Sequence, residues 1–258
     1  MGRAIRKGKT GVSRVVAWNV RSLRQVGKLE NLKLEMDRLE IDAAGISEMR
    51  WPESGDFWSG NYRIIHTGSG SGNKTGVGII LNKKAGRSVR DYIQYSDRIV
   101  MVRLESKPVN TVIIQVYMPT SAHSDDEIEE VYSDLEEVLK FVKGNENLII
   151  LGDWNAVIGE EEERGITGKY GLGTRNERDN RLIEFCNSNK LTIANTLFKN
   201  HKRRRYTWKM PGDIGRYQID YIMVRQRFKN QVKDCRSYPG PDIDSDHTLV
   251  MMKYKLKF

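Results

Sequence analysis

Short apolar runs of strand length recur along the whole chain. They are rich in Val, Ile and Leu, and most are bounded by turn residues, which is typical of β-strands. The runs cover residues 15–18, 43–46, 77–81, 99–102, 112–117, 148–151, 191–194, 219–224 and 249–252. Because most of them lack the alternation of a half-exposed strand, we expect both faces of the sheets to be covered.

Three stretches have helical periodicity instead. Apolar residues at spacings of three and four predict a helix over residues 29–39. A longer apolar stripe covers residues 128–142, and Ser124 followed by Glu127 predicts a capping box at its start. A third helix is expected over residues 177–187. Helices that interrupt a series of strands predict an α/β fold with helices packed on a two-sheet core.

The composition indicates one globular domain. The length of 258 residues predicts a single domain, residues 14–258. The basic residues before it predict a flexible arm, residues 1–13. No apolar run is long enough for a membrane-spanning helix, and the basic start lacks the apolar segment of a secretory signal. Two cysteines, Cys186 and Cys235, are too few for a disulfide framework or a zinc cluster, so we expect a reducing compartment.

The net charge of +9 favours an anionic partner, and nucleic acid is the leading candidate. The charge is unevenly spread, because residues 160–163 are all Glu whereas residues 199–209 are rich in Lys and Arg. The basic stretch also contains Tyr206 and Trp208. Such a stretch is typical of contacts to nucleic-acid phosphates, although a solvated surface hairpin can have the same composition.

Polar residues of catalytic type stand at or near the ends of the apolar runs. This set comprises Asn19, Glu48, Tyr117, Asp153, Asn155, Asp220, Asp246 and His247. Its carboxylate and amide oxygens, without thiolates, suit Mg²⁺ or Mn²⁺ better than a soft metal. The sequence has neither a Gly-rich phosphate loop nor a nucleophile elbow. We therefore expect metal-assisted attack of water on a phosphate ester.

Each of these residues also has a structural interpretation. Turn formers, strand aromatics, paired acids and buried histidines all occur without a catalytic role. The structural alternatives are turns or caps for Asn19, Asp153 and Asn155, an ion pair with Arg50 for Glu48, strand packing for Tyr117 and a buried imidazole for His247. Their common position at strand ends is what favours a site.

Seven sequence blocks, in order, resemble the endonuclease/exonuclease/phosphatase superfamily. They are WNVR at 18–21, ISEMRW at 46–51, YMP at 117–119, GDWN at 152–155, YTW at 206–208, QIDYI at 218–222 and SDH at 245–247. Residues 18–23, 48–51 and 171–178 look most like the endonuclease domain of RTE-type LINE retrotransposons and proteins similar to craniofacial development protein 2. The resemblance implies a four-layer α/β/β/α sandwich (deoxyribonuclease I-like) and Mg²⁺-dependent phosphodiester cleavage, with Mn²⁺ as an alternative ion.

The resemblance further implies the residues that hold the metal and the phosphate. Glu48 would be the principal metal ligand, with Asn19 beside it, and Asp246 would be a further ligand or support one. Tyr117 would hydrogen-bond to the scissile phosphate. This set therefore carries the expected electrostatic part of the reaction.

The remaining motif residues would handle the attacking water and its proton. Asp153 would orient or deprotonate the water, and Asn155 would hold the water and a phosphate oxygen. Asp220 would orient His247, which would polarise the phosphate or carry a proton. The product would have a free 3′-hydroxyl, which an RTE-type element uses to prime reverse transcription.

Double-stranded DNA is the expected partner, at a nuclear location and without a membrane. The sequence leaves the oligomeric state open, with a monomer as the expectation. The candidate DNA contacts are Arg21, Arg175, Arg178, Arg203, Arg204, Arg205, Thr207 and Trp208. Residues 210–216 follow as a turn, which in the retrotransposon endonucleases belongs to a hairpin that probes the minor groove.

Two alternatives to a DNA nickase stay open at this point. The chain could be a domesticated DNA-binding module with little catalysis, or an abasic-site repair endonuclease. Against the second, abasic-site endonucleases often have Asp or Gln where this chain has Arg21. Against the first, a pure binder has no need of Asp153, Asp220 and His247 together.

Overall fold

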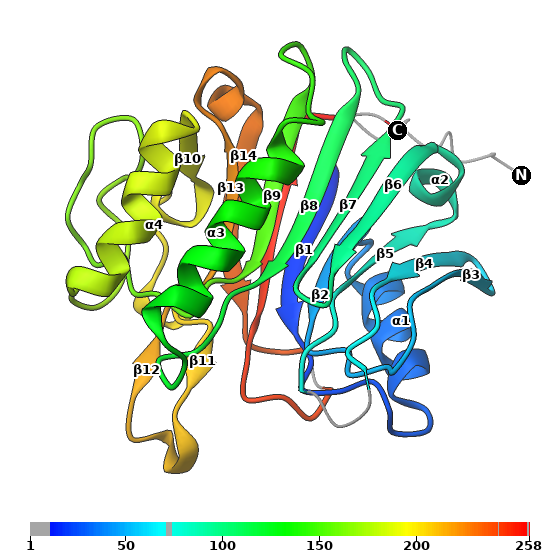
Figure 1. Ribbon diagram of the computed structural model, residues 1–258, viewed down its shortest axis with the longest axis horizontal. Helices are drawn as coiled ribbons and strands as arrows, with labels where there is room; N and C mark the ends of the chain where they lie inside the picture. Colours follow the sequence, from blue (N-terminus) through cyan, green and yellow to red (C-terminus); the bar gives the residue numbers. More distant parts are fainter. Residues whose placement is uncertain (1–10, 71–73, 242, 257) are drawn as a thin grey trace, which may run out of the picture.

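Two β-sheets face each other, and helices cover both outer surfaces (Figure 1). The structure, a computed structural model, describes residues 11–70, 74–241, 243–256 and 258. The arrangement confirms the predicted four-layer α/β/β/α sandwich. Most of the predicted basic arm, residues 1–13, lies outside the described residues.

The first sheet has seven strands in the order β14-β15-β1-β2-β5-β4-β3. They are β1 (Ser13–Asn19), β2 (Ala43–Ser47), β3 (Gly55–Ser59), β4 (Tyr62–His66), β5 (Gly78–Asn82), β14 (Val232–Tyr238) and β15 (Leu249–Tyr254). The central strands β1 and β2 are parallel, with Asn19 opposite Ser47. Their carboxyl ends therefore deliver Asn19 and the next residue after β2, Glu48, to one edge of the sheet.

The second sheet has six strands in the order β10-β13-β9-β8-β7-β6. They are β6 (Val89–Ser96), β7 (Ile99–Leu104), β8 (Thr111–Tyr117), β9 (Asn147–Asp153), β10 (Leu191–Ile193) and β13 (Asp220–Arg225). Parallel strands β8 and β9 pair Tyr117 with Asp153. Antiparallel strand β13 pairs Asp220 with the same Asp153. Three candidate residues therefore meet at the end of this sheet.

The three predicted helices are present and form the outer layers. Helix α1 (Lys28–Arg38) packs on the first sheet, and α3 (Asp125–Leu139) and α4 (Glu177–Ser188) pack on the second. The capping box of Ser124 and Glu127 at the start of α3 is confirmed. A short helix, α2 (Lys83–Arg87), was not predicted.

The core residues of β1 explain why its sequence is apolar on both faces. Val15 and Ala17 belong to the cluster between the two sheets, whereas Val16 and Trp18 pack in the cluster under α1. Burying an aliphatic side chain of this size contributes about 1.5 to 3 kcal/mol. The strand ends are consequently held by a packed interior on both sides, which gives the residues that follow them fixed positions.

The hairpin expected around the turn at residues 210–216 is present, between β11 (Trp208–Lys209) and β12 (Arg216–Tyr217). The basic residues before it form a short 3-10 helix, η2 (Lys202–Arg204), and not the alternative surface hairpin. The hairpin tip contains a further 3-10 turn, η3 (Pro211–Asp213), and the other 3-10 segments are η1 (Ala194–Thr196) and η4 (Gln226–Gln231). Figure 1 shows the hairpin projecting beyond the strand ends. Within the described part of the chain, no helix is long and apolar enough to cross a membrane.

Candidate active site

A pocket of about 420 Å³ opens where the strand ends of both sheets meet. Six of the eight candidate catalytic and metal residues line it, namely Glu48, Tyr117, Asp153, Asn155, Asp246 and His247. The other two, Asn19 and Asp220, are buried beneath it and hydrogen-bond to lining residues. The structure thus brings together all eight residues, from segments that are far apart in the sequence.

Asn19 connects the two sheets at the floor of the pocket. Its Nδ2 donates to Glu48 Oε1 and to Asp153 Oδ2, each at 2.9 Å. Its Oδ1 accepts from the backbone N–H of Arg21 at 3.0 Å, which fixes the orientation of the amide. Asn19 therefore orients two carboxylates in the structure, and its role as a metal ligand stays a prediction.

Glu48 receives hydrogen bonds on both carboxylate oxygens. Oε1 accepts from Asn19 and from the Tyr117 hydroxyl at 3.1 Å, and Oε2 accepts from Arg50. Burial alone would raise the pKa of Glu48, but these donors outweigh burial and lower the pKa. Glu48 is therefore ionised at neutral pH. Burial, together with Glu48 and Asp153, raises the pKa of Tyr117, so its hydroxyl keeps its proton and acts as a donor.

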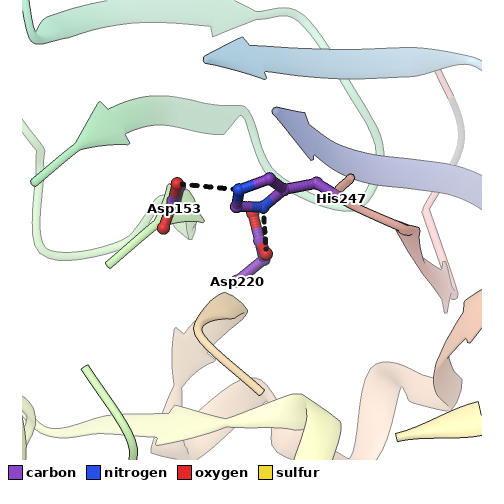
Figure 2. A group of neighbouring side chains, drawn as sticks. All are labelled: Asp153, Asp220 and His247. Atoms are coloured by element: carbon purple, nitrogen blue, oxygen red, sulfur yellow. Dashed lines mark hydrogen bonds and ion pairs between the residues drawn. The ribbon is translucent and has the colours of Figure 1, made fainter. Parts of the chain in front are cut away.

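His247 lies between two acids, Asp220 and Asp153 (Figure 2). Its Nδ1 lies 3.0 Å from Asp220 Oδ2, and its Nε2 lies 3.9 Å from Asp153 Oδ2. The side chain of His247 is only 7% exposed. Burial alone would lower the pKa of His247, but the Asp220 and Asp153 carboxylates outweigh burial and raise it to about 9. The imidazole is therefore protonated at neutral pH and donates to Asp220.

Asp153 has the properties of a general base. Burial and the neighbouring Asp220 raise the pKa of Asp153 to about 7, against the opposing effect of His247. A base with a pKa near the working pH is efficient in proton transfer. Its Oδ1 accepts from the backbone N–H of Asn155 at 3.1 Å, and Asn155 Nδ2 donates to the Met118 carbonyl at 2.8 Å. These bonds place Asn155 beside the base, at the rim of the pocket.

Thr207 and Asn195 hold the backbone around Asp220 in place, a role that the sequence did not predict for either residue. Thr207 Oγ1 accepts from the backbone N–H groups of Ile219 and Asp220, each at 3.0 Å. Asn195 donates to the Asp220 carbonyl and accepts from Ile222 N–H. Thr207 is fully buried, so the structure corrects its predicted contact with DNA to a supporting role. No sequence signal marked Asn195, because it lies in an ordinary apolar segment.

Asp246 connects the pocket to the hairpin. Its Oδ2 accepts from Trp208 Nε1 at 3.2 Å and lies 3.3 Å from an Arg21 guanidinium nitrogen. Its backbone carbonyl accepts from Lys209 N–H. Trp208 and Arg21 both line the pocket, so these two candidate DNA contacts lie beside the catalytic residues. Ser245, the first residue of the SDH block, donates to the Asn19 carbonyl and is structural.

The donor set of the pocket fits a hard divalent cation. Glu48 is ionised and lines the pocket, and the buried Oδ1 of Asp246 has no hydrogen-bond partner among the described residues. Carboxylate oxygens of this kind suit Mg²⁺ or Mn²⁺. We therefore expect Glu48 and Asp246 to hold the ion, with Asn19 orienting Glu48.

A second group of possible ligands, Asp153, Asp220 and His247, has donor atoms within 4.8 Å of one another. A cation there would have to replace the proton that His247 shares with Asp220. The raised pKa of His247 opposes loss of that proton. We therefore interpret this group as a proton-handling triad and not as the metal site.

The candidate DNA contacts fall into two groups. Arg203 is exposed in η2, and Arg204 is exposed with its guanidinium over the Tyr238 ring. The other three arginines are held by the protein. Arg175 pairs with Glu161 and Glu163, Arg178 donates to the carbonyls of Ser121 and His123, and Arg205 donates to the carbonyls of Asn200 and Gly171. These bonds hold the three arginines against loops of the protein, and their contacts with DNA stay predictions.

The Asp220–His247 pair makes stability depend on pH. The folded-state pKa of His247, about 9, exceeds the ordinary value near 6.5. The stabilisation is therefore complete below about pH 6.5 and is lost as the pH rises through about 9. Denaturant unfolding in EDTA should show His247→Gln less stable than wild type at pH 7, by on the order of 1 to 3 kcal/mol. That difference should shrink by pH 10, and a constant difference would contradict the raised pKa.

The chain matches the model of the endonuclease/exonuclease/phosphatase family over residues 16–247. It is also 43% identical over 240 residues to craniofacial development protein 2 of Bos taurus. That match covers 93% of this chain and 40% of the relative. A protein of the same description from Tragulus javanicus is 43% identical, with 42% of its length covered. The chain thus spans about two fifths of the curated relatives that it matches.

Solved structures share the fold at low sequence identity. The endonuclease domain of TRAS1, a telomere-specific non-LTR retrotransposon, superposes with a TM-score of 0.66 at 16% identity, covering 94% of this chain and 98% of that one. The AP endonuclease LMAP of Leishmania major superposes with a TM-score of 0.71 at 14% identity. That match covers 94% of this chain and 87% of the other. At these identities the likeness shows the fold alone.

Proposed function

The chain belongs to the endonuclease/exonuclease/phosphatase family, and from this premise we propose that it is a metal-dependent endonuclease that nicks double-stranded DNA. The observation that carries the proposal is that Glu48, Asp153 and His247 line one pocket, with Asp220 buried beneath it on His247. An ionised acid, a base and a protonated imidazole are the groups that hydrolysis of a phosphodiester requires.

The proposed reaction assigns one task to each group. Asp153 accepts a proton from a water molecule, whose oxygen bonds to phosphorus. The P–O3′ bond breaks, and O3′ leaves as a hydroxyl after taking a proton from solvent. The His247 imidazolium donates to a phosphate oxygen, where negative charge develops in the transition state. The Tyr117 hydroxyl has one proton, so it turns from Glu48 to donate to the phosphate. A divalent ion, when bound, would neutralise further charge at this phosphate.

Asp220 and Asn19 act through other residues. Asp220 fixes the orientation of the His247 ring and keeps it protonated. Asn19 aligns Glu48 with Asp153 and so couples the metal-binding acid to the base. The reaction breaks one strand, which then has a 3′-hydroxyl on one side of the break and a 5′-phosphate on the other side.

The hairpin is proposed to contact the DNA next to the break. Trp208 and Tyr217 line the pocket, and their rings lie 5.8 Å apart. Ile214 at the tip is 80% exposed. An apolar tip with flanking aromatics can read the shape of a groove without hydrogen bonds to bases. The hairpin is therefore the proposed source of target preference.

Lys202 and Arg203 are proposed to contact the DNA backbone, because both are exposed in η2, which packs against β14 and precedes the hairpin in the chain. Replacing both with Gln should lower the salt dependence of DNA binding, by about one unit of the log–log slope for each phosphate that is no longer neutralised. Fluorescence anisotropy with a labelled duplex in EDTA measures the slope. The control is Lys229→Gln. Lys229 lies in η4, which follows the end of β13 opposite to Asp220 and the pocket. Equal slopes for wild type and the double variant would remove these residues from the DNA interface.

The proposal is tested on a labelled duplex with and without a single abasic site. A nickase of the retrotransposon kind cuts intact DNA in the presence of Mg²⁺. Cleavage confined to the abasic duplex would assign the pocket to repair instead, and tight DNA binding without cleavage would make the chain a binding module. We also propose a nuclear location, because the proposed substrate is double-stranded DNA. Imaging that finds the tagged chain only outside the nucleus would contradict this location.

A further inference from the structure

Arg50 contacts the proposed metal ligand, and no step of the proposed reaction uses it. We propose that Arg50 is an exchangeable counter-ion of Glu48. It neutralises the Glu48 carboxylate while the site holds no metal ion, and it moves onto a DNA phosphate when the ion binds. The inference rests on the proposed metal-dependent function and adds a residue that links metal binding to DNA binding.

The first observation is that the donors of Glu48 are of two kinds. Asn19 and Tyr117, on Oε1, are neutral donors, whereas Arg50, on Oε2, is a cation. A divalent ion approaching Glu48 is repelled by the guanidinium but tolerates the neutral donors. The ion and Arg50 therefore compete for the same carboxylate oxygen.

The second observation is the backbone that brings the two side chains together. Glu48 and Arg50 have φ values of 55° and 58°, in the left-handed region that L-residues rarely adopt. Such conformations cost on the order of 1 kcal/mol or more each, and they persist only where the surroundings impose them. Here Met49, fully buried between them, donates to the Gly76 carbonyl at 2.8 Å, and Arg50 N–H donates to the Thr75 carbonyl at 3.0 Å. These backbone bonds hold the loop in a conformation that directs the side chains of Glu48 and Arg50 into one pocket.

The third observation is that the Arg50 guanidinium is not locked. Its side chain is 24% exposed and lines the pocket, and its buried Nε has no hydrogen-bond partner among the described residues. Arg175, by comparison, pairs with two carboxylates and is 14% exposed. A guanidinium with one carboxylate partner can exchange it for phosphate, with which arginine forms strong charge-assisted hydrogen bonds.

Reciprocal coupling follows from this exchange. DNA that draws Arg50 away exposes Glu48 to the metal ion, and an ion that displaces Arg50 makes it available to DNA. By linkage, each ligand must then tighten the binding of the other by the same factor. Without Arg50, metal alone should bind more tightly and the coupling should weaken.

The test is a Mn²⁺ titration of the whole chain without DNA, followed by the EPR signal of free Mn²⁺. Arg50→Gln should bind Mn²⁺ about fivefold or more tightly than wild type. The charge-matched control is Lys74→Gln, because Lys74 lines the same pocket and no ion pair joins it to Glu48 among the described residues. A similar gain in both variants would indicate a general charge effect and overturn the proposal. Arg50→Asn is a second variant, since Asn tolerates positive φ better than Gln does.

A second arm measures the coupling with DNA, in a His247→Gln background where hydrolysis is slow. Adding a short duplex should tighten Mn²⁺ binding about fivefold or more when Arg50 is present, and clearly less when it is Gln. Wild type that binds Mn²⁺ no differently from Arg50→Gln would overturn the counter-ion role and leave the proposed endonuclease function standing. Absence of Mn²⁺ binding in both proteins would overturn the metal-dependent function as well.

Discussion

Replacing His247 with Gln is expected to lower the rate of DNA nicking by about 10² to 10⁴-fold at saturating metal. The reason is the position of the imidazolium, which is 3.0 Å from Asp220 and faces the Asp153 carboxylate. Gln can donate a hydrogen bond but carries no positive charge, so it cannot stabilise the negative charge that develops on the phosphate as well as an imidazolium does. Single-turnover cleavage of a labelled duplex measures the chemical step without product release.

The control for this prediction is the double variant with Asp220. Asp220→Asn should also slow nicking, because it removes the carboxylate that orients and charges His247. If Asp220 acts through His247, the double variant should be hardly slower than His247→Gln alone. Rate losses that multiply would show that the two residues act independently, contrary to the assigned roles.

Replacing Glu48 with Gln is expected to weaken metal binding and lower nicking by about 10² to 10⁴-fold at low metal concentration. Gln keeps the size of the side chain and can still accept from Asn19 and Tyr117, and it loses only the bond from Arg50, so the fold should be retained. What is lost is the negative charge that attracts the ion. Nicking rate against Mn²⁺ concentration, with calorimetric Mn²⁺ binding, measures both effects.

Metal rescue distinguishes this loss from the loss in His247→Gln. A variant that binds the ion weakly should regain much of its rate at high Mn²⁺, whereas a variant without the imidazolium should not. Rescue of both variants, or of neither, would contradict the separation of Glu48 as metal ligand from His247 as charge donor.

The sequence predicted the layers and the position of the site because both depend on local patterns. Runs that are apolar on both faces, such as residues 112–117, could only be strands covered on two sides. The polar residues that end these strands were visible for the same reason. Strands β3, β6 and β14 were missed because they lie at sheet edges, where one side needs no partner and the sequence is largely polar. Strand β4, which lies between β5 and β3, was also missed, because its only aliphatic residues are Ile64 and Ile65.

The supporting contacts could not be predicted, because they depend on which segments become neighbours. Thr207 was assigned to DNA from its basic surroundings, whereas its hydroxyl is buried against the backbone of Asp220. Arg175 was predicted as a further contact to the DNA backbone, and its ion pairs with Glu161 and Glu163 were not visible in the sequence. A charge in the sequence shows that a partner is needed, but only the fold shows whether that partner is internal.

The proposed activity of this pocket is hydrolysis of one strand of duplex DNA with the help of a divalent ion. Incubating the chain with supercoiled plasmid and Mg²⁺, in parallel with EDTA and with His247→Gln, tests it most directly. We expect relaxed circles only for wild type with Mg²⁺, and nick ends that a DNA polymerase extends because they carry a 3′-hydroxyl. Nicking that persists in EDTA or at full rate in His247→Gln, or ends that cannot be extended, would contradict it.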